Sequence, residues 1–401
     1  MKAKQLLLYI LIVLASVTHA QDFGPNTKIS LLTFGPGNDL YSKFGHSAIR
    51  LNDPSQGLDL CYNYGTFDFD TPNFYGKFVR GKLDYILSVD KTALLLRYYK
   101  RTGREVIEQD IILDEVAVQR IAAFLIDNYK PENRTYKYDF FYDNCATRLR
   151  DIIEDQLGEQ MVYKGIAESD RVYRDLLIEK LESVPLVLLG INLILGPNTD
   201  KAVDLRGEMF LPSYLMDNLD SYGRYTDGEV LMSSKKLVFP ERLEFSDASI
   251  FRQPALYVFL LFLFSIYAYW RGVFTGALNV LGVFLFSLSA TCGLLFSFMW
   301  LATDHQTTYM NLNLFWANPL SIYFLIKMSK KKVPSIVLNT QKVLLLLAFL
   351  FLVVLPLIQI GIGRTVLNFI AVPKHIPFQI FVFSLIGMLC IQYARFKPQK
   401  K

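Results

Sequence analysis

Five long apolar stretches in the last third of the chain constrain its architecture more than any other feature of the sequence. They cover residues 254–270, 273–303, 309–326, 343–363 and 377–394. Each stretch is close to the roughly 20 residues that a helix needs to cross the roughly 30 Å hydrocarbon layer of a bilayer. The sequence therefore predicts an all-α transmembrane domain of five helices within residues 251–401.

The net charge differs sharply between this region and the rest of the chain. Residues 251–401 contain 13 lysines and arginines but one acidic residue, a balance of +12, so the first 250 residues carry −7 of the overall +5. Such an asymmetry is typical of an exported domain joined to a membrane domain. The basic residues lie between apolar runs, which argues against nucleic acid as a partner and favours a lipid bilayer.

The first 20 residues have the features of a secretory signal peptide. Lysines precede a short apolar run from Leu6 to Val17, and Ala20 supplies a small residue at the expected cleavage site. A short uncleaved anchor is the alternative, and either one exports residues 21–250. With that domain outside, ten basic residues of the C-terminal third lie inside and three lie outside, as the positive-inside rule requires. We therefore expect the C-terminus in the cytoplasm.

Residues 21–250 have the alternating and periodic patterns of an α+β domain. Helices are expected at 114–128 and from Cys145 onward, and strands at 28–33, 47–51, 60–64, 92–99 and 105–112, the last two as a pair. The uncharged segment 185–197 is too short to span a membrane. It is either a buried helix or a lid that touches the membrane over an acyl-chain site.

Cys145 is the strongest candidate for a nucleophile. Asp143 and Asn144 can cap a helix, which places Cys145 in its first turn. Backbone N–H groups and the positive end of the helix dipole favour a thiolate there, and the same groups can stabilise an oxyanion. The alternative is a disulfide with Cys61, because an exported domain meets an oxidising environment.

His46 is the candidate general base. Gly45 allows a close backbone approach, and His46 opens a strand from which its imidazole can face a cysteine at a helix N-terminus. A third residue should orient the imidazole. Asn63, Tyr64 and Asp68 all belong to the next strand or its end, and the sequence does not choose among them.

The order of these residues along the chain carries a family resemblance, because the histidine precedes the cysteine, whereas ordinary papain-like enzymes have the cysteine first. Gly-His-Ser-Ala-Ile-Arg at 45–50 and Asn-Cys-Ala-Thr-Arg-Leu at 144–149 resemble the motifs of circularly permuted NlpC-type papain-like hydrolases and acyltransferases, such as lecithin:retinol acyltransferase. The multi-span tail and the blocks at 62–69 and 138–147 extend the likeness. Over nearly its whole mature length, the chain resembles the Lnb-type lipoprotein N-acyltransferases of Bacteroidota.

This resemblance implies a permuted papain-like (NlpC-type) α+β domain followed by the five-helix transmembrane domain. It implies an apolipoprotein N-acyltransferase of the inner membrane, with its catalytic domain in the periplasm and with no cofactor or metal. Cys145 would take an acyl chain from a phospholipid as a thioester. His46 would act as base while the N-terminal amine of a diacylglyceryl-cysteine lipoprotein accepts that chain. A membrane-tethered NlpC-type cell-wall peptidase or amidase is the alternative function.

Further residues are candidates for substrate binding. Those beside the two motifs are Tyr62, Asp68, Asn144 and Arg148. His305 and Asn311 lie on or beside an outer loop at the membrane boundary, where polar residues often mark a site. For that loop, binding of a lipid headgroup or acceptor amine and simple helix capping both remain open.

Overall fold

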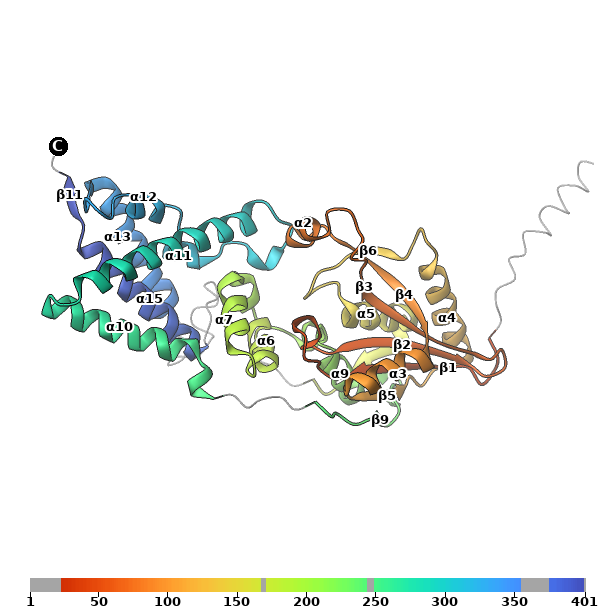
Figure 1. Cartoon of the computed structure of the whole chain (residues 1–401). Helices are drawn as coiled ribbons and strands as arrows, with labels where there is room; N and C mark the ends of the chain where they lie inside the picture. The colour runs from red at the N-terminus through yellow and green to blue at the C-terminus, as the bar shows by residue number, and fades with distance from the viewer. Residues whose placement is uncertain (1–22, 167–170, 244–248, 355–374, 400–401) are drawn as a thin grey trace, which may run out of the picture. The chain divides into compact units, whose positions relative to one another are not determined.

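Three separate stretches of chain build a sheet-based unit, and three others build a helical unit, whose elements are labelled in Figure 1. The computed structural model describes residues 23–166, 171–243, 249–354 and 375–399. The expected signal peptide lies outside these described residues. The sheet-based unit consists of Met1–Phe69, Asp84–Ile166 and Met209–Leu243. The helical unit consists of Asp70–Leu83, Ala167–Glu208 and Glu244–Lys401, so two of its segments come from within the expected exported domain 21–250.

The sheet has seven antiparallel strands in the order β6-β4-β3-β2-β1-β5-β9. In chain order they are β1 (Lys28–Phe34), β2 (His46–Asp53), β3 (Leu58–Thr66), β4 (Asp84–Lys91), β5 (Val106–Asp110), β6 (Thr135–Lys137) and β9 (Lys236–Phe239). The expected strands at 28–33, 47–51 and 60–64 are confirmed as β1, β2 and β3.

The connection from β1 to β2 places His46 directly opposite Phe34 in the sheet register. Gly45 precedes His46 with a φ of +81°, a conformation that favours glycine. A Cβ at Gly45 would lie 2.7 Å from the carbonyl oxygen of Phe34. The close backbone approach expected at this position is therefore confirmed, and it fixes where the imidazole leaves the sheet.

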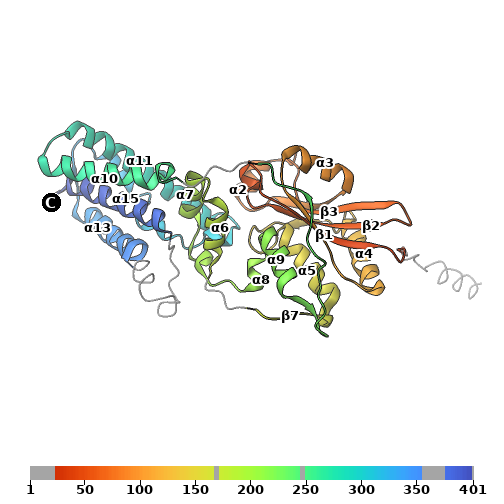
Figure 2. The ribbon, with the colours of Figure 1, turned by 90° about the horizontal axis from the view of Figure 1, so that it is seen from below.

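Helices cover both faces of this sheet (Figure 2). On one face α3 (Thr92–Thr102) packs against β3 and β4, and on the other lie α4 (Glu115–Tyr129), α5 (Cys145–Leu157) and α9 (Pro212–Tyr222). The helices expected at 114–128 and from Cys145, and the strand expected at 105–112, are confirmed. The strand expected at 92–99 is wrong. Leu95, Leu96 and Tyr99 share one face of α3 and pack on the sheet together, which a helix allows and a strand does not.

The described part of the helical unit holds four helices long and apolar enough to cross a membrane. They are α10 (Pro254–Arg271), α11 (Thr275–Leu301), α15 (Ile376–Ala394) and α13 (Ser335–Phe349), the last continued by the π-helical turn Leu350–Val354. They account for the apolar runs at 254–270, 273–303 and 377–394. The run at 343–363 begins within α13 and ends outside the described residues. An α+β domain followed by several apolar helices is thus confirmed, whereas the permuted papain-like topology stays a prediction.

The apolar run at 309–326 is not the continuous transmembrane helix that the sequence predicts. It contains two short pieces, η6 (Leu312–Phe315) and α12 (Ser321–Ile326), because asparagines and Pro319 favour caps and turns. This part of the chain nevertheless runs antiparallel along α11. The contacting pairs, from one end of α11 to the other, are Thr308 with Met299, Asn318 with Gly293, Ser321 with Ser289, Phe324 with Phe286, Met328 with Gly282, and Lys331 with Asn279.

Candidate functional site

Cys145 is the first residue of α5, and Asn144 forms the N-cap that holds it there. The Asn144 side-chain oxygen accepts hydrogen bonds from two backbone N–H groups of the first helical turn, at 2.8 and 3.0 Å. Its amide nitrogen donates to the carbonyl oxygens of Phe140 and Phe210 at 2.7 and 2.8 Å. These four bonds use the hydrogen-bonding capacity of the Asn144 side chain. The geometry therefore favours a positioning role for Asn144 over the expected contact with substrate.

The Cys145 thiol is half-buried against backbone N–H groups. Burial raises the pKa of the thiol above its ordinary value, and the N–H groups of Ser47, Ala146 and Cys145 itself oppose this by lowering the pKa. Burial has the larger effect, so the thiol is protonated at neutral pH. This differs from the resting thiolate that its helix position alone favours. Cys145 thus needs a base to become a nucleophile.

His46 lies half-buried at the start of β2, one residue before Ser47. Its ring stacks on Phe34 with centroids 5.8 Å apart, and its Nε2 lies 3.4 Å from the side-chain oxygen of Asn63. Burial lowers the pKa of His46 to about 4, although the contact with Asn63 acts in the opposite direction. The imidazole is therefore neutral at neutral pH and can accept a proton.

Asp90 determines which nitrogen of His46 is basic. The Asn63 amide nitrogen donates to the Asp90 carboxylate at 3.1 Å and to the Cys61 carbonyl oxygen at 3.4 Å, so the amide oxygen must face His46. An amide oxygen can only accept a hydrogen bond, so Nε2 carries the proton and Nδ1 is left as the acceptor. The chain of contacts from His46 through Asn63 to Asp90 crosses three neighbouring strands.

The other residues considered for orienting the imidazole lie elsewhere. The Tyr64 hydroxyl donates to Asn128 of α4 at 2.5 Å, on the sheet face opposite to that of Asn63. Tyr62 is buried on the same face as Tyr64. Asp68 lies beyond the end of β3 and is exposed. Among the described residues, Asn63 is the one of these candidates that contacts the imidazole.

Arg148 is engaged within the fold and lines a cavity beside α5. Its guanidinium forms a bidentate pair with Asp143 at 2.6 and 2.9 Å and lies 3.6 Å from the ring centre of Tyr136. The cavity has a volume of about 380 Å³ and is lined by Tyr64, Phe124, Asn128, Tyr142, Asp143, Arg148, Asp151, Ile152 and Asp155. Neither Cys145 nor His46 lines it. The structure therefore does not join the expected substrate-binding role of Arg148 to the thiol.

Cys61 is buried on the face of the sheet that α3 covers. Its sulfur lies 3.3 Å from the Thr92 hydroxyl, and burial raises the pKa of the Cys61 thiol to about 12. Cys61 and Cys145 are both free thiols, so the disulfide considered as the alternative is not present. The two cysteines thus differ in their surroundings: Cys61 is buried, and Cys145 is half-buried against backbone N–H groups.

The polar residues of the outer loop satisfy backbone groups inside the helical unit. The Asn311 amide donates to the last two carbonyl oxygens of α7 (Pro185–Ile194) at 2.7 and 2.9 Å. His305 Nε2 lies 3.1 Å from the carbonyl oxygen of Val79, the last residue of α2 (Phe74–Val79). Of the two alternatives for this loop, the contacts support helix capping.

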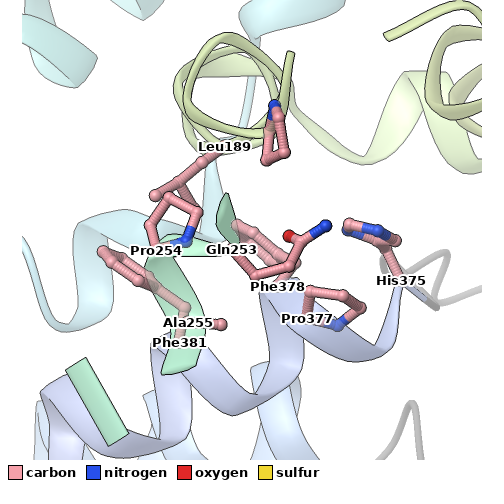
Figure 3. Close-up of a pocket in the computed structure, with 9 residues that line it drawn as sticks. Leu189, Gln253, Pro254, Ala255, His375, Pro377, Phe378 and Phe381 are labelled. Carbon is pink, nitrogen blue, oxygen red and sulfur yellow. The ribbon is translucent and has the colours of Figure 1, made fainter. Parts of the chain in front are cut away.

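The apolar segment 185–197 forms α7, which packs against the apolar core of the helical unit through Leu189, Leu193 and Ile194. Leu186 on the same helix is 73% exposed, so the helix is only partly buried. A small cavity beside α7, shown in Figure 3, is lined mainly by apolar residues and by His375. Its volume of about 10 Å³ has room for about one water molecule, which excludes it as an acyl-chain site.

Comparison with protein families gives two matches that divide the chain in the way the charge pattern does. Residues 20–177 match the Lnb N-terminal periplasmic domain, and residues 246–370 match the Lnb transmembrane domain. The chain belongs to the Lnb family. It is therefore a membrane-associated, lipoprotein-modifying protein with a periplasmic N-terminal domain. Comparisons with curated proteins and with solved structures gave no match.

In this Lnb-type protein, the periplasmic-domain match includes both His46 and Cys145. Sequence reasoning does not single out three further residues: Ser47, whose N–H lies against the Cys145 sulfur, Asp90, which holds Asn63, and Arg104, whose charge acts on both Cys145 and His46. Asp90 pairs with Cys61 in the sheet register, and that register is not readable from one strand alone.

No group of three or more His, Cys, Asp or Glu side chains in the described ranges could hold a metal ion.

Proposed function

We propose that this Lnb-type protein is an apolipoprotein N-acyltransferase that works through a thioester on Cys145. The observation that carries the proposal is a neutral thiol whose sulfur lies against the residue that follows a neutral imidazole in the chain. Cys145 lies against the N–H of Ser47, and His46 is the residue before it. Because Asn63 holds Nε2–H, the imidazole is ready to take the thiol proton through Nδ1 when an ester is bound.

In the first half-reaction, the Sγ–H proton of Cys145 moves to His46, and the sulfur attacks an ester carbonyl of a membrane phospholipid. The N–H groups of Ser47 and Ala146, which lie near the sulfur, receive the negative oxygen of the tetrahedral intermediate. The bond between the carbonyl carbon and the glycerol oxygen then breaks. His46 gives the proton to that oxygen, a lysophospholipid leaves, and the acyl group stays on Cys145.

In the second half-reaction, the uncharged α-amine of a diacylglyceryl-cysteine lipoprotein attacks the thioester carbonyl. His46 accepts a proton from the attacking nitrogen, the C–S bond breaks, and the thiolate recovers the proton. The product is an amide, and the enzyme returns to its starting state. The transmembrane helices give both lipid substrates access from the outer leaflet of the inner membrane, and the C-terminus lies in the cytoplasm.

The test uses purified full-length protein in phospholipid vesicles, with a diacylated lipopeptide that has a free N-terminus. Mass spectrometry should detect one added acyl chain on the lipopeptide and a transient acyl group on Cys145. Cys145→Ala should lose both products, whereas the matched control Cys61→Ala should keep them. Undiminished acylation by Cys145→Ala would refute the thioester. Release of muropeptides without acyl transfer would instead support the cell-wall peptidase.

A further inference from the structure

Arg104 is a buried cation whose charge acts on both Cys145 and His46. Arg104 is 7% exposed, and its Nε donates a hydrogen bond to the carbonyl oxygen of Gly35 at 2.8 Å. Its Nη2 is buried without a hydrogen-bond partner, and no carboxylate of the described residues forms an ion pair with it. Burying an unpaired cation is costly, and a binding site can compensate that cost by taking up an anion.

A stack of rings connects Arg104 to the imidazole. The guanidinium lies 4.7 Å from the ring centre of Tyr99, Tyr99 stacks on Phe34 at 3.8 Å, and Phe34 stacks on His46 at 5.8 Å. Burial is the main influence on the pKa of both His46 and Cys145, and the charge of Arg104 also lowers the pKa of each. Arg104 is therefore connected to His46 through the stacked rings of Tyr99 on α3 and Phe34 on β1.

The surface beside Arg104 has the character of a lipid contact. The short helix η1 (Leu40–Ser42) precedes His46 in the chain, and its Leu40 and Tyr41 side chains are 51% and 72% exposed. Tyr41 is near enough to Arg104 for the guanidinium charge to act on its hydroxyl. A Cβ at Gly37 would lie 3.4 Å from the Cδ of Arg104, so the loop after β1 also packs closely on this side chain.

We propose that Arg104 binds the phosphate of the phospholipid acyl donor and so places an ester carbonyl of the same molecule against the Cys145 sulfur. This rests on the acyl transfer proposed above and specifies what the donor must carry. The unpaired Nη2 would donate to a phosphate oxygen, a charge-assisted bond that a neutral glyceride cannot form. Exposed Leu40 and Tyr41 would contact the apolar part of the same lipid.

The test compares two acyl donors, dioctanoylphosphatidylglycerol and dioctanoylglycerol, in the same detergent with full-length protein. For Arg104→Gln, kcat/KM for acylation of Cys145 by the phospholipid should fall about 10- to 100-fold, mainly through KM, since a hydrogen bond between charged groups is lost. Acylation by dioctanoylglycerol should change less than about threefold. Arg104→Lys should restore part of the phospholipid rate, and the exposed Arg101→Gln should alter neither donor.

An equal loss with both donors would overturn the proposal, because Arg104 would then act on the reacting pair or on the fold. No change with either donor would overturn it as well. Thermal unfolding shows whether Arg104→Gln has a folding defect. If it has, Arg104→Lys is the deciding variant: a partly restored phospholipid rate supports the proposal, and an equal loss with both donors overturns it.

A binding measurement separates this proposal from the acyl transfer itself. Full-length Cys145→Ala should bind dihexanoylphosphatidylglycerol at least about tenfold more tightly than dihexanoylglycerol, and Arg104→Gln should remove that difference. This holds even if the wild-type protein transfers no acyl chain, a result that would refute the proposed function alone. Binding of inorganic phosphate as tight as that of the phospholipid would show a free-phosphate site and overturn the lipid assignment.

Discussion

Two histidines show how differently the two units use polar side chains. In the sheet-based unit, His46 gives one nitrogen to Asn63 and keeps the other as a proton acceptor. In the helical unit, His305 places Nε2 on a carbonyl oxygen at the end of α2, and Asn311 caps α7 in the same way. Helix ends leave carbonyl oxygens without partners, and these claim nearby donors. A polar residue at a membrane boundary thus indicates a functional site only where its side chain does not already bond to backbone groups.

The largest effect should separate the two histidines directly. We expect His46→Ala to slow acylation of Cys145 by about 10³-fold, because the protonated thiol then has no base. His305→Ala should leave the rate per folded molecule within about threefold, since its ring satisfies a carbonyl oxygen. The measurement is the single-turnover rate of Cys145 acylation by intact-protein mass spectrometry. Similar losses of acylation rate in both variants would contradict the different roles assigned to the two histidines.

A smaller loss is expected at the far end of the chain of contacts behind His46. Asp90→Asn presents a side chain that can donate as well as accept, so the Asn63 amide is no longer held with its oxygen toward the imidazole. We expect kcat to fall about tenfold with KM unchanged. Asp84→Asn, at an exposed ion pair on the same strand, is the control and should have no effect. An effect of Asp90→Asn on KM alone would argue against orientation of the base.

The pH dependence should differ between the two half-reactions. The pKa of His46 is lowered to about 4, so acidification protonates the imidazole and stops thioester formation only as the pH falls through about 4. Transfer to the lipopeptide should already decline below about pH 8, because an α-amine must lose its proton to attack. Rapid-quench measurement of each half-reaction tests this. A midpoint near 6.5 for thioester formation would show an imidazole with ordinary hydration.

Removing a cap in the helical unit should affect stability and spare the chemistry. Asn311→Ala leaves the Ile194 carbonyl oxygen of α7 without its side-chain donor and the Leu193 oxygen with Asn313 alone, and we expect a loss of about 1–3 kcal/mol in the free energy of unfolding. The acylation rate per folded molecule should stay unchanged. Thermal unfolding together with the acylation assay gives both quantities. A large drop in rate at unchanged stability would restore the substrate-binding role expected from the sequence.

The smallest effect concerns the second cysteine. Iodoacetamide should label Cys145 slowly at neutral pH and faster as the pH rises, because burial raises its pKa. Cys61 should stay unlabelled in the folded protein, since it is buried and its pKa is about 12. Peptide mapping before and after unfolding measures both sites. Labelling of Cys61 at the rate of Cys145 would mean that α3 does not protect it.

Local signals in the sequence were sufficient to place Cys145 at the start of a helix and His46 at the start of a strand. An asparagine before Cys145 predicts the helix start, and a glycine before His46 predicts the turn into β2, because each depends on neighbouring residues alone. Asp90 and Arg104 could not be found in this way. Asp90 is connected to His46 through the pairing of neighbouring strands, and Arg104 is connected to it through a stack of rings. Both connections exist only in the assembled fold.

The membrane part shows a different limit of prediction. The segment 309–326 is uncharged like its neighbours, yet Pro319 and several asparagines replace a helix by short pieces that pack along α11. The segment 70–83 likewise gives no apolar signal of its membership in the helical unit. Its α2 is placed there by the contact between Val79 and His305, which are far apart in the sequence.

The interleaving of the two units has a consequence for how the protein is made. α7 leaves the ribosome before α10, α11 and α15, yet the core that it packs against is built from those later helices. Until those helices are made, the leucines of α7 lack the partners against which they pack in the folded protein. A gene truncated after Leu243 would encode the whole sheet and also an apolar helix deprived of its partners. Removing residues 70–83 and 167–208 together, with short linkers in their place, is the cleaner route to an isolated sheet domain.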